Sequence, residues 1–211
     1  WGESHGKAVG VVVDGCPAGL PLTEADIQTL LDRRKPGQNK YTTARKEGDE
    51  VQILSGTFEG KTTGTPISMV VFNQDQRSRD YGNIMNTYRP GHADYTFDEK
   101  YGFRDYRGGG RSSGRETTAR VAAGAVAAKI LKELGIEVHA YTKAIGPVSV
   151  PENEYHPEEI FQNPIYMPSN AYAQKASAYL EECIKNQDSS GGIIECVVTG
   201  MPVGIGDTVF E

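Results

Sequence analysis

The chain has 211 residues, of which 37% are hydrophobic and 24% charged, with a formal net charge of -6. This composition is typical of a soluble globular protein with a sizeable core. The acidic surface argues against non-specific binding to nucleic acids or membranes, because both are polyanions. No apolar run approaches the roughly 18 residues of a membrane span, and the N-terminus has no signal core, so we expect a cytoplasmic protein.

Two elements are predicted at the start of the chain. The β-branched run at residues 8–15 indicates a strand that follows a glycine-bounded turn at residues 2–6. Thr23, with Asp26 three residues on, predicts a capped helix over residues 24–34. The next stretch, residues 39–50, is polar and charged and indicates a mobile loop that could close over a ligand.

The rest of the chain mixes strands with helices. Residues 51–58 and 65–72 alternate in polarity and predict two strands. An alanine-rich helix is expected at about residues 114–134, stopped by Gly135. Further strands near residues 136–141 and 193–199 flank a helix near 171–185. This order favours an α+β fold over regular βαβ alternation.

The cysteines do not indicate a disulfide scaffold or a metal site. They are three in number, Cys16, Cys183 and Cys196, and lack metal-ligand spacing. Few and unpaired cysteines are typical of a reduced intracellular protein. We therefore expect structural thiols and no bound metal.

A glycine-rich segment before the alanine-rich helix carries the strongest local chemical signal. Residues 107–115 combine three consecutive glycines with Ser112, Ser113 and three arginines. The backbone N–H groups at a helix N-terminus attract phosphate, which predicts an anion site. The alternative is that a serine only caps the helix while the arginines face water. The segment lacks Gly-Lys-Ser/Thr, so it does not indicate nucleotide hydrolysis.

Histidines and arginines point to chemistry on a small, multiply anionic substrate. All eleven arginines lie between Arg33 and Arg120, and His5 and His92 sit in glycine-bounded turns. Guanidinium groups match phosphates and carboxylates bidentately, and histidine exchanges protons near neutral pH. Either histidine could instead be a solvated turn residue, and Asp94 could orient His92 or cap the next segment. His139 and His156 are expected to be structural.

Four aromatic residues allow two interpretations. They could pack beside a planar cofactor, or they could belong to the core, as such residues more often do. These residues are Tyr95, Tyr101, Phe103 and Tyr106.

Several motifs together resemble the chorismate synthase family. They are Gly2-Glu3-Ser4-His5-Gly6, Arg89-Pro90-Gly91-His92-Ala93-Asp94 and Gly110-Arg111-Ser112-Ser113-Gly114-Arg115-Glu116-Thr117, with Asp32-Arg33-Arg34, Tyr41-Thr42-Thr43, Leu54-Ser55-Gly56 and Asp75-Gln76-Arg77. The resemblance covers essentially the whole sequence but lacks the family's C-terminal part. It implies one catalytic domain over residues 1–211, incomplete at both ends, and a fragment without activity of its own.

The resemblance implies a lyase of the shikimate pathway. The family converts 5-enolpyruvylshikimate 3-phosphate to chorismate by anti-1,4 elimination of phosphate, with reduced FMN and no net redox change. It implies a homotetramer whose fold is a β-α-β sandwich, with helices between two antiparallel sheets. Some members bind NADPH to reduce their own flavin, and others rely on an external reductase.

The same resemblance assigns roles to individual residues. His5 matches a catalytic histidine beside the substrate phosphate, and His92 matches one near N1 of the flavin. Arg111, Ser112 and Ser113 match an FMN-binding segment, and Arg34 and Lys40 match a region for NADP. The residues matching substrate-binding positions are Ser4, Arg34, Lys40, Arg45, Arg89, Ser113 and Arg115. Lys40 stands where arginine is common in relatives, which keeps the charge but loses the bidentate fork.

Two other classes of function remain open. An anion-binding regulatory module would bind phosphate esters without regard to flavin, His5 or His92. A flavin-independent phosphate lyase would turn over in air without reductant.

Overall fold

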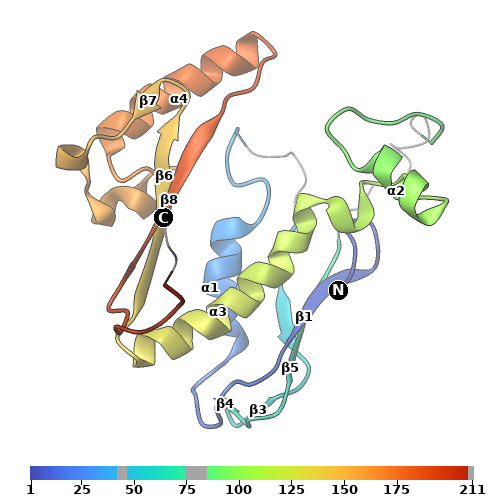
Figure 1. Ribbon diagram of the computed structural model, residues 1–211, viewed down its shortest axis with the longest axis vertical. Coiled ribbons are helices and arrows are strands. Elements are labelled where there is room, and N and C mark those ends of the chain that lie inside the picture. Colours follow the sequence, from blue (N-terminus) through green and yellow to red (C-terminus); the bar gives the residue numbers. More distant parts are fainter. Residues whose placement is uncertain (42–46, 75–84, 209–211) are drawn as a thin grey trace. The chain divides into compact units, whose positions relative to one another are not determined.

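The computed structural model describes residues 1–41, 47–74 and 85–208 and has an α+β fold with antiparallel sheets (Figure 1). The α+β class expected from the sequence is therefore confirmed. The chain forms two compact units, Trp1–Gly37 with Thr42–Ile130 and Gln38–Tyr41 with Leu131–Glu211. The single domain over residues 1–211 and the layering of helices between two sheets stay predictions.

The first unit is built on a three-stranded antiparallel sheet. Its strands are β1 (Ala8–Val13), β5 (Ile67–Phe72) and β2 (Val51–Ile53), in the order β1-β5-β2. A hairpin of β3 (Thr57–Phe58) and β4 (Lys61–Thr62) follows β2. The predicted continuous strand over residues 51–58 is wrong, because Gly56 adopts φ +85° and lies so close to Ile67 that the chain turns there.

Helix α1 (Glu24–Arg34) confirms the predicted capped helix. The Asp26 carboxylate accepts hydrogen bonds from the backbone N–H of Thr23 at 2.8 Å and from its hydroxyl at 3.0 Å. Lys129 also donates to Asp26 at 2.7 Å, which ties α1 to the alanine-rich helix. This hydrogen bond from Lys129 makes the largest contribution to the lowered pKa of Asp26.

Helix α2 (Asp94–Tyr101) was not predicted. Its sequence is strongly polar, with Asp94 as its only buried residue, so it carries little amphipathic signal. The helix ends where Gly102 adopts a left-handed conformation.

Helix α3 (Thr117–Glu133) begins three residues later than predicted. Two short 3-10 turns precede it, η2 (Gly110–Ser112) and η3 (Gly114–Glu116). The positive φ angles of the glycines at 108–110 give this segment a tight, irregular path, so that helical geometry starts only at Thr117.

The core of the first unit lies between its sheet and helices α1 and α3. Helix α1 contributes Ile27 and Leu31, both fully buried, and each such side chain stabilises the fold by roughly 1.5–3 kcal/mol. Small residues let α3 approach closely. The cluster also contains Val9, Val51, Ile67, Met69 and Val71 of the sheet and Ala122, Ala125 and Val126 of α3.

The second unit has a sheet of order β7-β6-β8, formed by β6 (Glu137–Ile145), β7 (Val148–Ser149) and β8 (Gly192–Thr199). Strand β6 is longer than predicted and has an irregularity between Thr142 and Ala144. Helix α4 (Asn170–Lys185) and the 3-10 helices η4 (Glu152–Glu154) and η5 (Pro157–Gln162) complete the unit. Its core consists of Val150, Ile165, Met167, Ala173 and Ala176.

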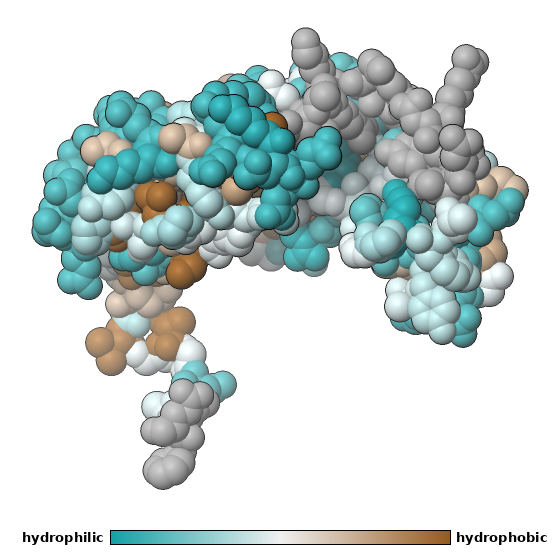
Figure 2. Space-filling view, turned by 90° about the horizontal axis from the view of Figure 1, so that it is seen from above, coloured by the Kyte–Doolittle hydropathy of each residue, from teal (hydrophilic) through white to brown (hydrophobic). Residues whose placement is uncertain are grey.

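The coloured part of the face in Figure 2 is largely hydrophilic, with apolar side chains among the polar ones. Exposed apolar residues lie on and after β8, including Ile194 and Val203. Within the described part of the chain, none of the helices has the length and apolar character needed to cross a membrane.

Candidate functional site

A turn before β1 presents Ser4 and His5. Asn73, which follows β5, holds this turn through its side-chain amide, which donates to the backbone carbonyls of Glu3 and Gly6, each at 2.9 Å. Ser4 is 1% exposed, while His5 is half-buried. The strand pairing of β1 with β5 therefore fixes where His5 lies.

The hydrogen bonds of Ser4 fix the orientation of the His5 ring. Ser4 Oγ donates to the carbonyl of Gly108 at 3.1 Å and lies 3.0 Å from His5 Nδ1. A hydroxyl has one proton, and a carbonyl can only accept. The Ser4 oxygen is therefore the acceptor of an Nδ1–H of His5, which makes Nε2 the proton-exchanging atom of the neutral ring. Ser4 is occupied in this way, so its predicted role as a substrate donor stays a prediction.

Glycine is required at position 108 by the closeness of His5. A Cβ there would lie 1.9 Å from His5 Nδ1, and the residue has φ +65°. Gly109 and Gly110 also adopt positive φ. Gly108 thus packs against the ring of His5, a contact between positions more than 100 residues apart.

The two serines of the glycine-rich segment make local hydrogen bonds. Ser113 Oγ accepts from the backbone N–H of Arg115 at 3.3 Å and caps η3. Ser112 Oγ donates to the carbonyl of Gly109 at 2.7 Å. Ser113 thus caps the short turn η3 and not α3, and the anion site at this segment stays a prediction.

A cavity of about 300 Å³ opens beside this segment. Its walls combine aromatic rings with charged groups. Tyr101 and Phe103 are 57% and 78% exposed and Tyr95, outside the cavity, 55%, so their interpretation as core residues is wrong. The lining residues include Phe97, Tyr101, Phe103, Arg104, Arg111 and Ser112.

Arg89 is held by a bidentate pair with Asp94 at the start of α2. Its Nε and Nη2 donate to the two carboxylate oxygens at 2.9 and 2.8 Å. These hydrogen bonds are the main reason why the pKa of Asp94 lies well below its usual range. Asp94 therefore neither orients His92 nor acts as the N-cap of α2, which is Ala93. His92 is exposed, with Nδ1 3.2 Å from the carbonyl of Pro90.

Two further arginines lie at the glycine-rich segment. Arg111 Nη1 donates to the carbonyl of Gly2 at 2.6 Å, and its Nη2 lies 3.4 Å from Glu116. Arg107 forms a bidentate pair with Asp105, at 2.8 and 2.6 Å. The pKa of Asp105 is lowered first by Arg107 and to a smaller extent by the charge of His5.

Arg115 is buried, which its predicted role in substrate binding did not anticipate. Its side chain is 3% exposed and donates to Asp49 and, at 2.9 Å, to Asn73. Glu47 lies 3.9 Å from it. Glu47 and Asp49 are buried, so their assignment to a mobile loop over residues 39–50 is wrong for these two positions. Glu47 and Asp49 lie in a polar stretch, and nothing in the sequence indicated that these two acids would be buried.

Arg34 closes this group from the last turn of α1. Its Nη1 donates to Asp49 at 3.0 Å and its Nη2 to the carbonyl of Gly114 at 3.1 Å. The structure thus brings together Arg34, Arg115 and the turn after Ser113. Asp49 and Thr117 are members of this site that sequence reasoning missed.

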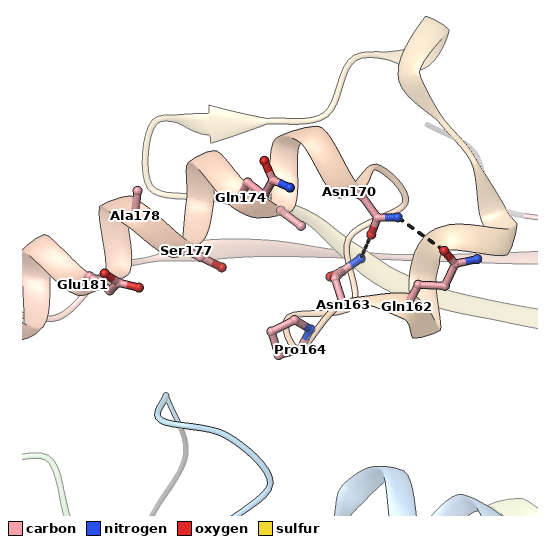
Figure 3. A pocket seen from close by; sticks show the side chains of 9 residues that line it. Gln162, Asn163, Pro164, Asn170, Gln174, Ser177, Ala178 and Glu181 are labelled. Carbon is pink, nitrogen blue, oxygen red and sulfur yellow. Dashed lines mark hydrogen bonds between the residues drawn. The ribbon is translucent and has the colours of Figure 1, made fainter.

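Lys40 belongs to the second unit, where it pairs with Glu181 of α4. An open groove of about 540 Å³ runs beside that residue (Figure 3). Amide side chains dominate it, with Asn163 bonded to Asn170 and Asn170 to Gln162. The residues that line this groove are uncharged except for the carboxylate of Glu181, so the lining does not suit an anion. Lys40 and Arg34 therefore belong to different units, and their joint role in binding NADP stays a prediction.

Three further residues were singled out in the sequence. Arg45 lies outside the described residues. His139 and His156 belong to the second unit, beside Glu137 and Glu158. Within residues 1–41, 47–74 and 85–208, no group of three or more histidine, cysteine or acidic residues is arranged to hold a metal ion.

The fold and the site define an α+β protein in which a histidine and several acid-paired arginines lie at or contact one glycine-rich segment. Comparison with known proteins gives the family. The family model for chorismate synthase matches residues 1–211, and the chain belongs to the chorismate synthase family.

Known chorismate synthases are similar to this chain over its whole length. The chain is 66% identical over 211 residues to chorismate synthases of Agathobacter rectalis and Lachnoclostridium phytofermentans, and 55% identical over 210 residues to that of Sphingopyxis alaskensis. All of this chain is covered in each case, but it spans only 58% of the length of each of these relatives. A crystal structure of chorismate synthase superposes with a TM-score of 0.74 at 32% identity, covering 94% of this chain and 56% of that one.

Proposed function

We propose that the protein carrying this chain is a chorismate synthase. It would eliminate phosphate from 5-enolpyruvylshikimate 3-phosphate, anti-1,4, to give chorismate in the shikimate pathway. The observation that carries the proposal is the match to the family along all 211 residues. The site residues support it, because an oriented histidine and the arginines of the same unit are residue types that suit a phosphate leaving group.

His5 is the group proposed to assist departure of the phosphate. Its Nδ1 side faces Ser4, so the protonated imidazolium would give its Nε2 proton to the phosphate oxygen and return to the neutral ring. General acid catalysis of this kind contributes about 10²–10⁴-fold. Arg34, Lys40, Arg45, Arg89 and Arg115, with Ser4 and Ser113, are proposed to bind the phosphate and carboxylates of the substrate.

The chemistry of the lining fits part of a flavin site. The cavity next to η2 has aromatic walls, which suit a planar group, and it is also lined by Arg104 and Arg111 and by the carboxylates of Glu3, Asp94 and Asp105. We propose that Arg111, Ser112 and Ser113 hold FMN and that His92 steadies the negative charge near N1. Reduced FMN, when bound, supplies electron density to the allylic system and receives it back.

The remaining proposals concern the whole protein. NADPH would serve flavin reduction through Arg34 and Lys40. We further propose a cytoplasmic homotetramer without metal, nucleic-acid or membrane partners. Analytical ultracentrifugation of the intact protein would test the oligomeric state.

Anaerobic turnover of the intact protein tests the function. With reduced FMN and 5-enolpyruvylshikimate 3-phosphate, chorismate and inorganic phosphate should form in equal amounts. His5→Ala should lower kcat about 10²–10⁴-fold. His139→Ala is the matched control, because His139 lies in β6 beside Glu137, and turnover should not change.

Two results would contradict the proposal. Turnover in air without reductant would favour a flavin-independent lyase. Binding of the phosphate ester without turnover, and without a change on adding flavin, would favour an anion-binding module. Titrating oxidised FMN with and without substrate, by flavin absorbance, separates these cases.

A further inference from the structure

Asp49 is a fully buried carboxylate that bonds to two arginines. Its residue is 1% exposed and its side chain 0%. One oxygen accepts from Arg34 Nη1 at 3.0 Å, and the other accepts a short hydrogen bond from Arg115 Nη1. The two arginines come from α1 and η3, so one acid joins both elements.

Arg34 is fixed on three of its nitrogens. Besides the bond to Asp49, its Nε donates to Thr117 Oγ1 at 3.3 Å and its Nη2 to the carbonyl of Gly114 at 3.1 Å. Thr117 Oγ1 in turn donates to the same carbonyl at 2.6 Å. The plane of the guanidinium is therefore set by three acceptors in different directions.

Burial differs sharply across this pair. The side chain of Arg34 is 20% exposed, whereas that of Asp49 is not exposed at all. The carboxylate thus lies behind a guanidinium that reaches the surface. Glu47 adds a second buried carboxylate next to Arg115, so among the described residues two acids accompany these two arginines.

The backbone of Asp49 is also unusual. It has φ +50°, a left-handed conformation that costs most residues roughly 1–2 kcal/mol and that Asp adopts more readily than they do. Desolvating a carboxylate adds a further cost. Unfavourable local terms of this kind persist where the surrounding contacts enforce them, and they are concentrated at functional sites.

We propose that Asp49 is a positioning residue that holds the Arg34 guanidinium ready for the phosphate or a carboxylate of the substrate. This inference rests on the proposed function. An arginine fixed in advance loses less side-chain freedom when an anion binds, so preorganisation appears as affinity. Asp49 itself does not touch the substrate.

A double-mutant cycle in the intact protein tests this role. The readout is the Kd for 5-enolpyruvylshikimate 3-phosphate without flavin, measured by calorimetry. Asp49→Asn should raise Kd about 10- to 100-fold, the value of one charge-assisted hydrogen bond. Arg34→Ala should raise it similarly. If Asp49 acts through Arg34, the double variant should bind no more weakly than Arg34→Ala alone.

Two further variants separate positioning from stability. Asp26→Asn removes an acid paired with Lys129 in the same unit and should lower stability without changing Kd. Thr117→Val leaves the buried pair of Asp49 and Arg115 intact but removes one acceptor of Arg34. It should raise Kd about 3- to 10-fold, and it serves if Asp49→Asn does not fold.

The outcomes are distinct. Unchanged Kd in Asp49→Asn, or in Thr117→Val where Asp49→Asn does not fold, overturns the positioning role and leaves the proposed function standing. Additive losses in the double variant also overturn it. A wild-type protein that neither binds the ester nor forms chorismate refutes the proposed function and this inference with it.

Discussion

Replacing Gly108 with alanine puts a methyl group where the ring of His5 lies. The added Cβ would be 1.9 Å from Nδ1 and 2.0 Å from Cε1 of His5, so the ring must move and the Ser4–His5 hydrogen bond must break. The left-handed φ of +65° costs alanine roughly 1–2 kcal/mol. Overpacking adds about 1–3 kcal/mol, so a total loss of about 2–5 kcal/mol is expected.

Gly102→Ala is the matched control. Gly102 has φ +79° but no atom within 4 Å of an added Cβ, so it suffers the backbone cost alone. Urea unfolding should therefore place Gly108→Ala about 1–3 kcal/mol below Gly102→Ala. In the intact protein, kcat should fall about 10²-fold or more for Gly108→Ala only. Equal stability and equal turnover in the two variants would refute the packing of His5 against the glycine segment.

Three further predictions concern stability. Asp94→Asn leaves Arg89 beside a neutral amide in a half-buried setting and should lower the free energy of unfolding by about 3–5 kcal/mol; a loss below 1 kcal/mol in urea would show that Arg89 finds other partners. Because the folded pKa of Asp94 is depressed, its contribution is fully present well above the unfolded pKa of about 3.9 and is lost as pH falls below that value. The free energy of unfolding should thus fall more steeply between pH 6 and pH 2 in wild type than in Asp94→Asn. Parallel curves of this free energy against pH would contradict this reasoning. Ala122→Leu in α3 overfills a site that is 2% exposed and should cost about 1–3 kcal/mol, whereas Ala128→Leu on the exposed side should leave the melting temperature nearly unchanged.

Local signals were sufficient for some of the fold. Thr23 and Asp26 correctly predicted the start of α1, and Gly135 predicted the end of α3. These features depend on hydrogen bonds within a few residues of each other, so the sequence contains them directly. The break after Ile53 depends instead on the approach of Gly56 to Ile67, which no local pattern reveals.

The site shows the same division. The glycine-rich segment and His5 were recognisable as chemical motifs, but their contact through Gly108 requires the pairing of β1 with β5 and the path before α3. Asp49 was missed because a single acid in a charged stretch looks solvated. Only the tertiary structure places it behind Arg34 and Arg115.

The pairing of cations with acids has a consequence for ligand affinity. Carboxylate partners already accompany Arg89 and Arg111. A phosphate ester that binds these cations replaces carboxylates and not water alone, so association is an exchange of one anion for another. A displaced carboxylate that then faces phosphate gains proton affinity, since like charges raise a carboxyl pKa. Binding should therefore draw protons from the solution, and the heat released should vary with the ionisation enthalpy of the buffer.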